Sequence, residues 1–147
     1  DIINFNIIIT LVSMQNQKKK VEVVAAVIKH NNKILCVQRG ENKLPYISKK
    51  YEFPGGKIEA GETKEQTIKR EIMEELHMEI STGDELVTVE HEYPDFFLTM
   101  HSFICTCADP TIKLTEHIDF KWLATSELEG LDWASADVPI VAQLMNA

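Results

Sequence analysis

Residues 55–78 read GGKIEAGETKEQTIKREIMEELHM, and their pattern predicts a glycine pair followed by a loop and an amphipathic α-helix. Thr63 and Gln66 have the spacing of a capping box, in which Thr63 is the helix N-cap and Gln66 reaches back to it. Apolar residues recur every four positions and predict the stripe that faces the core: Ile68, Ile72 and Leu76. The helix should therefore begin after Thr63 and end near His77.

The same helix gathers three carboxylates beside its apolar stripe. At about 100° per residue, Glu71, Glu74 and Glu75 occupy one arc roughly 100° wide, and neighbouring like charges repel each other. Such an arc suits a hard cation, because Mg²⁺ takes oxygen ligands from a few carboxylates and from substrate phosphates. On spacing alone, a solvated charged face explains the pattern at least as well, since Glu is a good helix former. In that case Arg70 is simply an i,i+4 partner of Glu74.

On both sides of this stretch the sequence predicts strands. Residues 21–28 (VEVVAAVI) indicate a buried strand, and a turn over 30–33 leads to a second strand over 34–38. Residues 41–50 predict a loop and residues 53–56 (FPGG) a tight bend. After the helix, we expect strands over 85–93, 97–106 and 117–123, a helical turn over 126–128, and a helix over 135–145 with Pro139 in its first turn. This order predicts an α/β fold with a mixed sheet and helices packed on it.

Composition narrows the class of protein. The chain has 147 residues, which fits one domain, and 26% of them are charged, as in ordinary globular proteins. Its formal net charge of −8 argues against a nucleic-acid polymer as partner, because domains that bind such polymers are usually basic. Three cysteines without a CxxC spacing are expected to be free, buried thiols in a reducing cytoplasm: Cys36, Cys105 and Cys107.

The first residues differ from the rest of the chain. Residues 1–12 are rich in Ile, but they are too few to span a bilayer, which takes about 20 apolar residues. They also lack the positive start of a signal peptide. Met14 precedes a polar run and is the expected natural start, so residues 1–20 are interpreted as an N-terminal extension and residues 21–147 as the domain. We expect no membrane association and either a monomer or a homodimer.

The residues around the helix also match a family signature. Gly56, a gap of five residues, Glu62, a gap of seven residues and Arg-Glu-Ile-Met-Glu-Glu at 70–75 resemble the Nudix box. The resemblance extends from residue 21 onward and is nearest to the MutT-like and CTP-pyrophosphohydrolase branch, in segments 21–28, 51–63, 90–103 and 135–141. One position departs, because His77 stands where the family has Gly. That departure concerns the helix C-cap more than the metal ligands.

This resemblance implies a Nudix-type α-β-α sandwich and a hydrolase of phosphoric anhydride bonds. The implied cofactor is Mg²⁺, for which Mn²⁺ can substitute. Its implied ligands are a backbone carbonyl and carboxylates from the helix and a later loop: Gly55, Glu71, Glu74, Glu75 and Glu116. Glu71 is implied to be a further ligand or the base that activates water, and Arg70 to orient a glutamate. Taken alone, Glu116 is more simply a solvated loop charge.

Contacts to the base and phosphates are expected outside the box. Asp137 stands where MutT-like enzymes place Asn or Asp against the base edge. Ionised Asp would only accept hydrogen bonds, as the cytosine amino group requires, whereas protonated Asp could also serve oxidised guanine. Asp137 could also cap the last helix. Arg39 could reach the α-phosphate or be a surface charge, and Phe53 could stack on the base or belong to the core. Gly56 and Lys57 are also expected at the substrate.

The implied function is Mg²⁺-dependent hydrolysis of a nucleoside triphosphate to the monophosphate and pyrophosphate. The substrate would be of CTP/dCTP type or 8-oxo-dGTP type, which the sequence does not separate, and the role would be nucleotide-pool sanitation. Another nucleoside diphosphate-linked substrate, a nucleotide sugar or a dinucleotide, would use the same chemistry. A non-catalytic binding module of the same fold is less favoured, because Glu71, Glu74 and Glu75 are all present.

Overall fold

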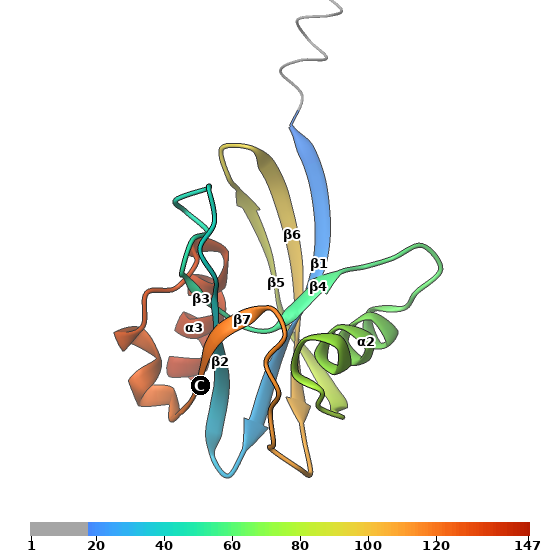
Figure 1. Ribbon diagram of the computed structural model, residues 1–147, viewed down its shortest axis with the longest axis vertical. Helices are drawn as coiled ribbons and strands as arrows, with labels where there is room; N and C mark the ends of the chain where they lie inside the picture. Colours follow the sequence, from blue (N-terminus) through green and yellow to red (C-terminus); the bar gives the residue numbers. More distant parts are fainter. Residues whose placement is uncertain (1–17) are drawn as a thin grey trace, which may run out of the picture.

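The computed structural model describes residues 18–147, so the expected start at Met14 and most of the expected extension lie outside the described residues. In this part of the chain, four strands precede a helix, three more strands follow it, and helical segments end the chain (Figure 1). Its elements are β1 (Lys19–His30), β2 (Lys33–Arg39), β3 (Tyr51–Glu52), β4 (Gly55–Lys57), α2 (Lys64–Leu76), β5 (Ser81–Glu92), β6 (Phe96–Thr106), β7 (His117–Leu123), the 3₁₀ helices η1 (Thr125–Gly130) and η2 (Ser135–Asp137), and α3 (Val138–Met145).

The strands form one mixed sheet of seven strands within residues 18–147. Its main order is β3-β2-β1-β6-β5, and β4 pairs with β1 while β7 pairs with β2. Only the pairing of β1 with β6 is parallel among the described strands, and the other pairs are antiparallel. Figure 1 shows α2 on one side of the sheet and α3 on the other. The predicted α-β-α sandwich with a mixed sheet is therefore confirmed.

Alternation along β1 divides the core into two halves. Even-numbered residues of β1 pack with the stripe of α2, and the residues concerned are Val24, Ala26, Ile28, Ile68, Ile72 and Leu76. Odd-numbered residues face the other side and pack with α3 and the segment before it, through Ala25, Val27, Trp133, Ile140 and Leu144. Because successive strand residues point to opposite faces, a buried apolar run such as 21–28 can serve both layers.

The ends of α2 follow the predicted capping. Thr63 Oγ1 accepts a hydrogen bond from the Gln66 amide at 3.1 Å, and Gln66 Oε1 accepts one from the Thr63 amide at 2.9 Å. The helix ends at Leu76, and His77 follows with φ of 52°, in the left-handed region. The amide of His77 donates to the Met73 carbonyl at 3.1 Å. A histidine therefore occupies a C-cap conformation that favours glycine.

Several boundaries differ from the sequence-based expectations. The bend predicted over 53–56 is present only at Pro54. The prediction was wrong for Gly55 and Gly56, which lie extended in β4 and pair with β1. The strand expected over 85–93 already begins at Ser81, because pairing with β6 overrides the turn-forming composition of its first residues. Residues 135–137 form a 3₁₀ helix, and the α-helix expected from 135 begins only at Val138, before Pro139.

The three cysteines are free and buried, as predicted. Burial raises the pKa of the Cys36 and Cys105 thiols to about 12, which makes them poor nucleophiles near neutral pH. Within residues 18–147, no helix combines the length and the apolar character that crossing a bilayer requires.

We expect His77→Gly to stabilise the protein by roughly 0.5–1 kcal/mol, because glycine adopts the left-handed conformation without the steric cost of a Cβ. The His77 side chain is exposed, so its removal should cost little packing. His77→Ala is the matched control, since it removes the imidazole but keeps the Cβ in the left-handed region. Urea unfolding of the three proteins measures the effect, and an equal gain from both variants would contradict the backbone explanation.

Candidate active site

Close approach of backbone explains the two glycines of β4. A Cβ on Gly55 would lie 1.9 Å from the carbonyl oxygen of Val24, so only glycine permits this pairing with β1. A Cβ on Gly56 would lie 2.3 Å from the carboxyl carbon of Glu71. Gly56 therefore leaves the space in which a carboxylate of the α2 helix approaches the strand. The glycine pair brings the sheet and the acidic helix face together at one point.

Arg70 connects the loop before α2 with the acidic face of the helix. Its Nε lies 2.7 Å from Glu62 Oε2, and one terminal nitrogen lies 2.9 Å from Glu71 Oε1 and 3.3 Å from Glu74 Oε2. The other terminal nitrogen donates to the Lys57 carbonyl at 3.2 Å. Hydrogen bonds from Arg70 lower the pKa of Glu62 to about 2. The helical pair of Arg70 and Glu74 exists, but it is one part of a wider network that orients Glu71.

Glu75 is the most constrained of the acidic residues. Only 6% of it is exposed, and its Oε2 has no hydrogen-bond partner within the described part of the chain. Burial, and to a lesser extent the nearby charges of Glu52, Glu71 and Glu116, together raise the pKa of Glu75 to about 9, while the backbone of Gly55 opposes the shift. A buried carboxyl among other carboxyl groups, with no cation paired to it, fits a divalent cation as its missing partner.

The other predicted ligands lie around Glu75 at different depths. Glu71 is mostly buried, and burial raises its pKa while Arg70 opposes the shift. Glu116 is exposed in the loop before β7, near enough to raise the pKa of both Glu71 and Glu75. Glu74 is 58% exposed and turned toward Arg70. Within residues 18–147, no three acidic, histidine or cysteine side chains already surround a common point. Glu74 and Glu116 would therefore have to turn toward a bound cation.

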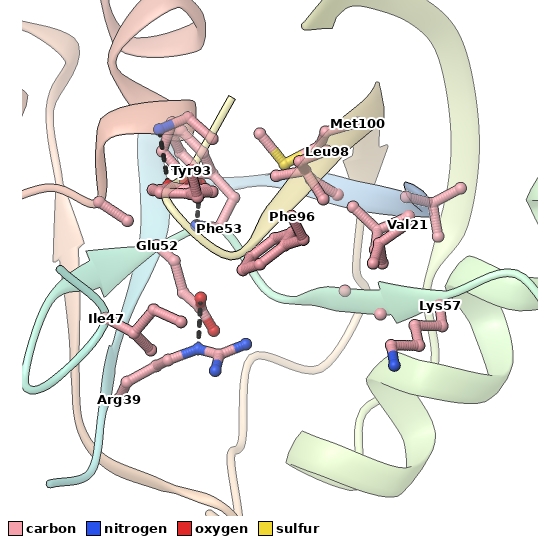
Figure 2. A pocket seen from close by; sticks show the side chains of 18 of the residues that line it. Val21, Arg39, Ile47, Glu52, Phe53, Lys57, Tyr93, Phe96, Leu98 and Met100 are labelled. Carbon is pink, nitrogen blue, oxygen red and sulfur yellow. Dashed lines mark hydrogen bonds and ion pairs between the residues drawn. The ribbon is translucent and has the colours of Figure 1, made fainter. Parts of the chain in front are cut away.

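A cavity of about 480 Å³ opens beside this acidic face. Its lining is largely apolar, and residues of β1 and β6 form one side of it, where Figure 2 shows Val21, Phe96, Leu98 and Met100. The five residues predicted to bind substrate all line this cavity: Arg39, Phe53, Gly56, Lys57 and Asp137. A largely apolar cavity with a few polar groups is the usual form of a small-molecule site.

Phe53 and Asp137 form one end of the cavity. Phe53 is buried and stacks on Trp133 with ring centroids 4.8 Å apart, so it belongs to the core as well as to the cavity wall. Asp137 Oδ1 accepts a hydrogen bond from the Phe53 amide at 3.0 Å. Although Asp137 occupies the N-cap position of α3, its side chain makes no capping hydrogen bond. Burial raises its pKa well above the ordinary value, the charge of Glu52 adds to the shift, and the Phe53 amide opposes it.

Two residues of this site were missed in the sequence. Glu52 lines the cavity, and its Oε1 lies 2.8 Å from the Nε of Arg39. Its Oε2 lies 2.9 Å from the Nε2 of His117, the first residue of the strand predicted over 117–123. Glu52 directly precedes the FPGG segment, and that position was the one available signal. His117 offered none, because its contact with Glu52 joins two distant parts of the chain.

The chain belongs to the Nudix family, because the NUDIX domain profile matches residues 23–143, which is most of the chain. Members of this family hydrolyse phosphoric anhydride bonds and in general use divalent metal cations, so this chain is a Nudix hydrolase.

Named relatives show which members of the Nudix family this chain resembles. The CTP pyrophosphohydrolase of Escherichia coli (strain K12) is 32% identical over 130 residues, which cover 86% of this chain and 93% of that protein. The 8-oxo-dGTP diphosphatase of Proteus vulgaris is 40% identical over 91 residues, which cover 60% of this chain and 79% of that protein. The solution structure of the E. coli ORF135 protein superposes with a TM-score of 0.74 at 30% identity, covering 88% of this chain and 91% of that one.

We expect Glu75→Gln to stabilise the metal-free protein at neutral and alkaline pH. Because the folded pKa of Glu75 is about 9 and the ordinary value is 4.5, the folded state binds more protons than the unfolded state between these values. The stability that the wild type has at low pH is therefore lost progressively as the pH rises through this window. Gln does not titrate, so its advantage should grow with pH and vanish below about 4.5.

Thermal unfolding in EDTA across this pH range measures the difference. Glu74→Gln is the matched control, because Glu74 is exposed and its replacement should leave the pH dependence unchanged. The same pH dependence of stability in both variants would contradict the conclusion that the buried Glu75 carboxyl destabilises the protein at high pH.

Proposed function

We propose that this Nudix hydrolase uses Mg²⁺ to convert nucleoside triphosphates to the monophosphate and pyrophosphate. One observation carries the proposal: a single cavity extends from Asp137 and Phe53 to Gly55, Gly56 and Lys57, beside the acidic face of α2. A nucleotide fits this arrangement because its base is flat and hydrogen-bonding, whereas its phosphates require cations. The relatives named for CTP and for 8-oxo-dGTP support a nucleotide of this class.

The end of the cavity at Gly55 and Gly56, next to the acidic face of α2, is proposed to be its metal end, and to bind the ion through oxygen donors only. The carbonyl of Gly55 and the carboxylates of Glu71, Glu74, Glu75 and Glu116 would hold the ion, and such a donor set suits Mg²⁺, with Mn²⁺ as a substitute. The bound ion would neutralise phosphate charge and lower the pKa of a water molecule. The unpartnered oxygen of Glu75 is the observation that favours this use of the acidic face.

The side chains around the metal end would then accept the proton of the attacking water and neutralise the charge of the phosphates. Water attacks the β-phosphorus, the bond from that phosphorus to the oxygen shared with the α-phosphorus breaks, and the nucleoside monophosphate leaves. Glu71 is proposed to accept the proton of the water, because its carboxylate lies at the acidic face against Gly56, where Arg70 orients it. Arg70 would hold Glu71 in place. Arg39 and Lys57, which line the cavity, would face the phosphates.

Recognition of the base is proposed to rest on Asp137. Its Oδ1 is occupied by the Phe53 amide, so the other oxygen would meet the base. The raised pKa favours the protonated form, which offers a hydroxyl donor in addition to acceptors. A neutral group of this kind suits a cytosine edge or an oxidised guanine edge, so the role as a pool-sanitising enzyme covers both substrate types. The three free cysteines fit a reducing cytoplasm as its compartment.

Glu75→Gln and Glu74→Gln should each lower kcat by more than about a hundredfold at saturating Mg²⁺, because each removes a charged ligand while keeping the shape of the side chain. Release of pyrophosphate from a panel of triphosphates, nucleotide sugars and dinucleotides measures the activity. The fold of each variant is checked by thermal unfolding. Near-normal kcat in either variant would refute the ligand assignment.

The same panel tests the metal and the substrate class. Wild-type activity should disappear in excess EDTA and return with Mg²⁺ or Mn²⁺. Faster turnover of a nucleotide sugar or a dinucleotide than of any triphosphate would refute the proposed substrate class.

Asp137→Leu should lower kcat/KM for the preferred triphosphate by roughly ten- to a hundredfold at neutral pH, because an unpaired polar group on the base costs about 1–3 kcal/mol. Asp137→Asn should stay within a few-fold of the wild type and keep the order of substrates, since Asn reproduces the acceptor and the donor of a protonated carboxyl. Steady-state kinetics on the same panel measure both variants. If Asn is as damaging as Leu, the carboxyl acts in its ionised form and the proposed donor role is wrong.

A further inference from the structure

Three side chains from three strands form a continuous polar chain beside the cavity. Glu52 of β3 lies between Arg39 of β2 and His117 of β7. Its Oε1 accepts from the Arg39 Nε at 2.8 Å, and its Oε2 pairs with the His117 Nε2 at 2.9 Å. Each oxygen of the carboxylate therefore has one partner. Hydrogen bonds to an ionised carboxylate are stronger than those between neutral groups, so this arrangement restrains Glu52 from both sides.

Strand register brings the three residues together. β2 pairs with β3 on one side and with β7 on the other, and Gln38 is opposite Tyr51. The register of β2 and β7 shifts between Gln38 and Arg39, which places Arg39 opposite His117. A bulge of this kind re-aims the side chain that follows it, and bulges are frequent next to active sites.

The contact with Glu52 determines how Arg39 faces the cavity. Only the Nε of Arg39 is bound, and within residues 18–147 neither terminal nitrogen has a hydrogen-bond partner. Figure 2 shows the Glu52 carboxylate against the Nε edge, with the terminal nitrogens directed away from it. The free edge of a guanidinium can bind two phosphate oxygens in parallel. Glu52 thus leaves available the edge that recognises phosphate.

His117 reaches the cavity only through Glu52. Its side chain is 4% exposed, it does not line the cavity, and its Nδ1 is buried without a partner in the described part of the chain. An unpaired buried nitrogen destabilises the fold. An apolar residue of similar size at this position should therefore be tolerated, which makes a functional test possible.

We propose that His117 is a positioning residue, which fixes Glu52 so that Glu52 holds Arg39 toward the substrate phosphates. The inference rests on the proposed function, in which Arg39 meets the α-phosphate. That phosphate gains charge as the monophosphate leaves, so a misaligned guanidinium lowers kcat more than it raises KM. The effect of His117 passes through Arg39 and leaves the metal end unchanged.

The test compares His117→Leu, His117→Gln, Arg39→Gln and the double variant His117→Leu/Arg39→Gln. His117→Leu should lower kcat by about ten- to a hundredfold. His117→Gln should recover most of that loss, because its amide nitrogen can replace Nε2. The double variant should be no slower than Arg39→Gln alone. His101→Leu is the matched control, since His101 pairs with Glu22 at 2.7 Å in another part of the sheet, and its kcat should be unchanged.

Three results would overturn the proposal: wild-type kcat in His117→Leu, losses that multiply in the double variant, or a raised Mg²⁺ requirement, which would show a disturbed Glu116. Thermal unfolding of each variant separates misfolding from a functional loss. Failure of the proposed function has a different signature, because the wild type would then turn over no triphosphate. The same variants are in that case compared on the substrate that the panel selects.

Discussion

The buried carboxyl group of Glu75, surrounded by other carboxyl groups, is the constraint on which the rest of this site depends. Burial and the charges of Glu52, Glu71 and Glu116 all act against ionisation of Glu75, and one of its oxygens has no partner. The fold maintains this unfavourable group because Ile72 and Leu76 anchor the same helix in the core. The apolar stripe therefore stabilises the helix, while the acidic face beside it keeps a buried carboxyl oxygen without a partner in the described part of the chain, as the proposed metal site requires.

Two arginines place positive charge near these carboxyl groups, but neither of them pairs with Glu75. Arg70 contacts Glu62, Glu71 and Glu74, and Arg39 contacts Glu52. Within residues 18–147, neither arginine forms an ion pair with Glu75. Arg39, which lines the cavity, is held at its Nε by Glu52, so less conformational entropy is lost when its free edge binds a ligand. The two arginines thus restrain the glutamates around Glu75 and leave Glu75 itself without an ion pair in the described part of the chain.

The features that the sequence predicted well are local ones. The capping box of Thr63, the stripe of α2 and the strand His117–Leu123 depend on spacing within a few residues, and each was confirmed. The family and the hydrolase class followed from the box around Glu71. The bend assigned to Gly55 and Gly56 was wrong, because a glycine pair at a turn and one at a close strand contact look alike in sequence. Glu52 and His117 were missed because their contact depends on strand register across β3, β2 and β7.

Four consecutive residues, Phe53 to Gly56, connect the two ends of the cavity. The Phe53 amide binds Asp137, the Pro54 carbonyl accepts from the Ala26 amide at 2.8 Å, and the two glycines lie against β1 and Glu71. Because this segment is fixed at both ends, the distance between the Asp137 carboxyl and the acidic helix face is set by the sheet and not by a loop. In the proposed reaction, a base that does not fit at Asp137 would displace the phosphates relative to Glu71 and Glu75. In that reaction, selection of the base and cleavage of the anhydride would be coupled through this one short segment.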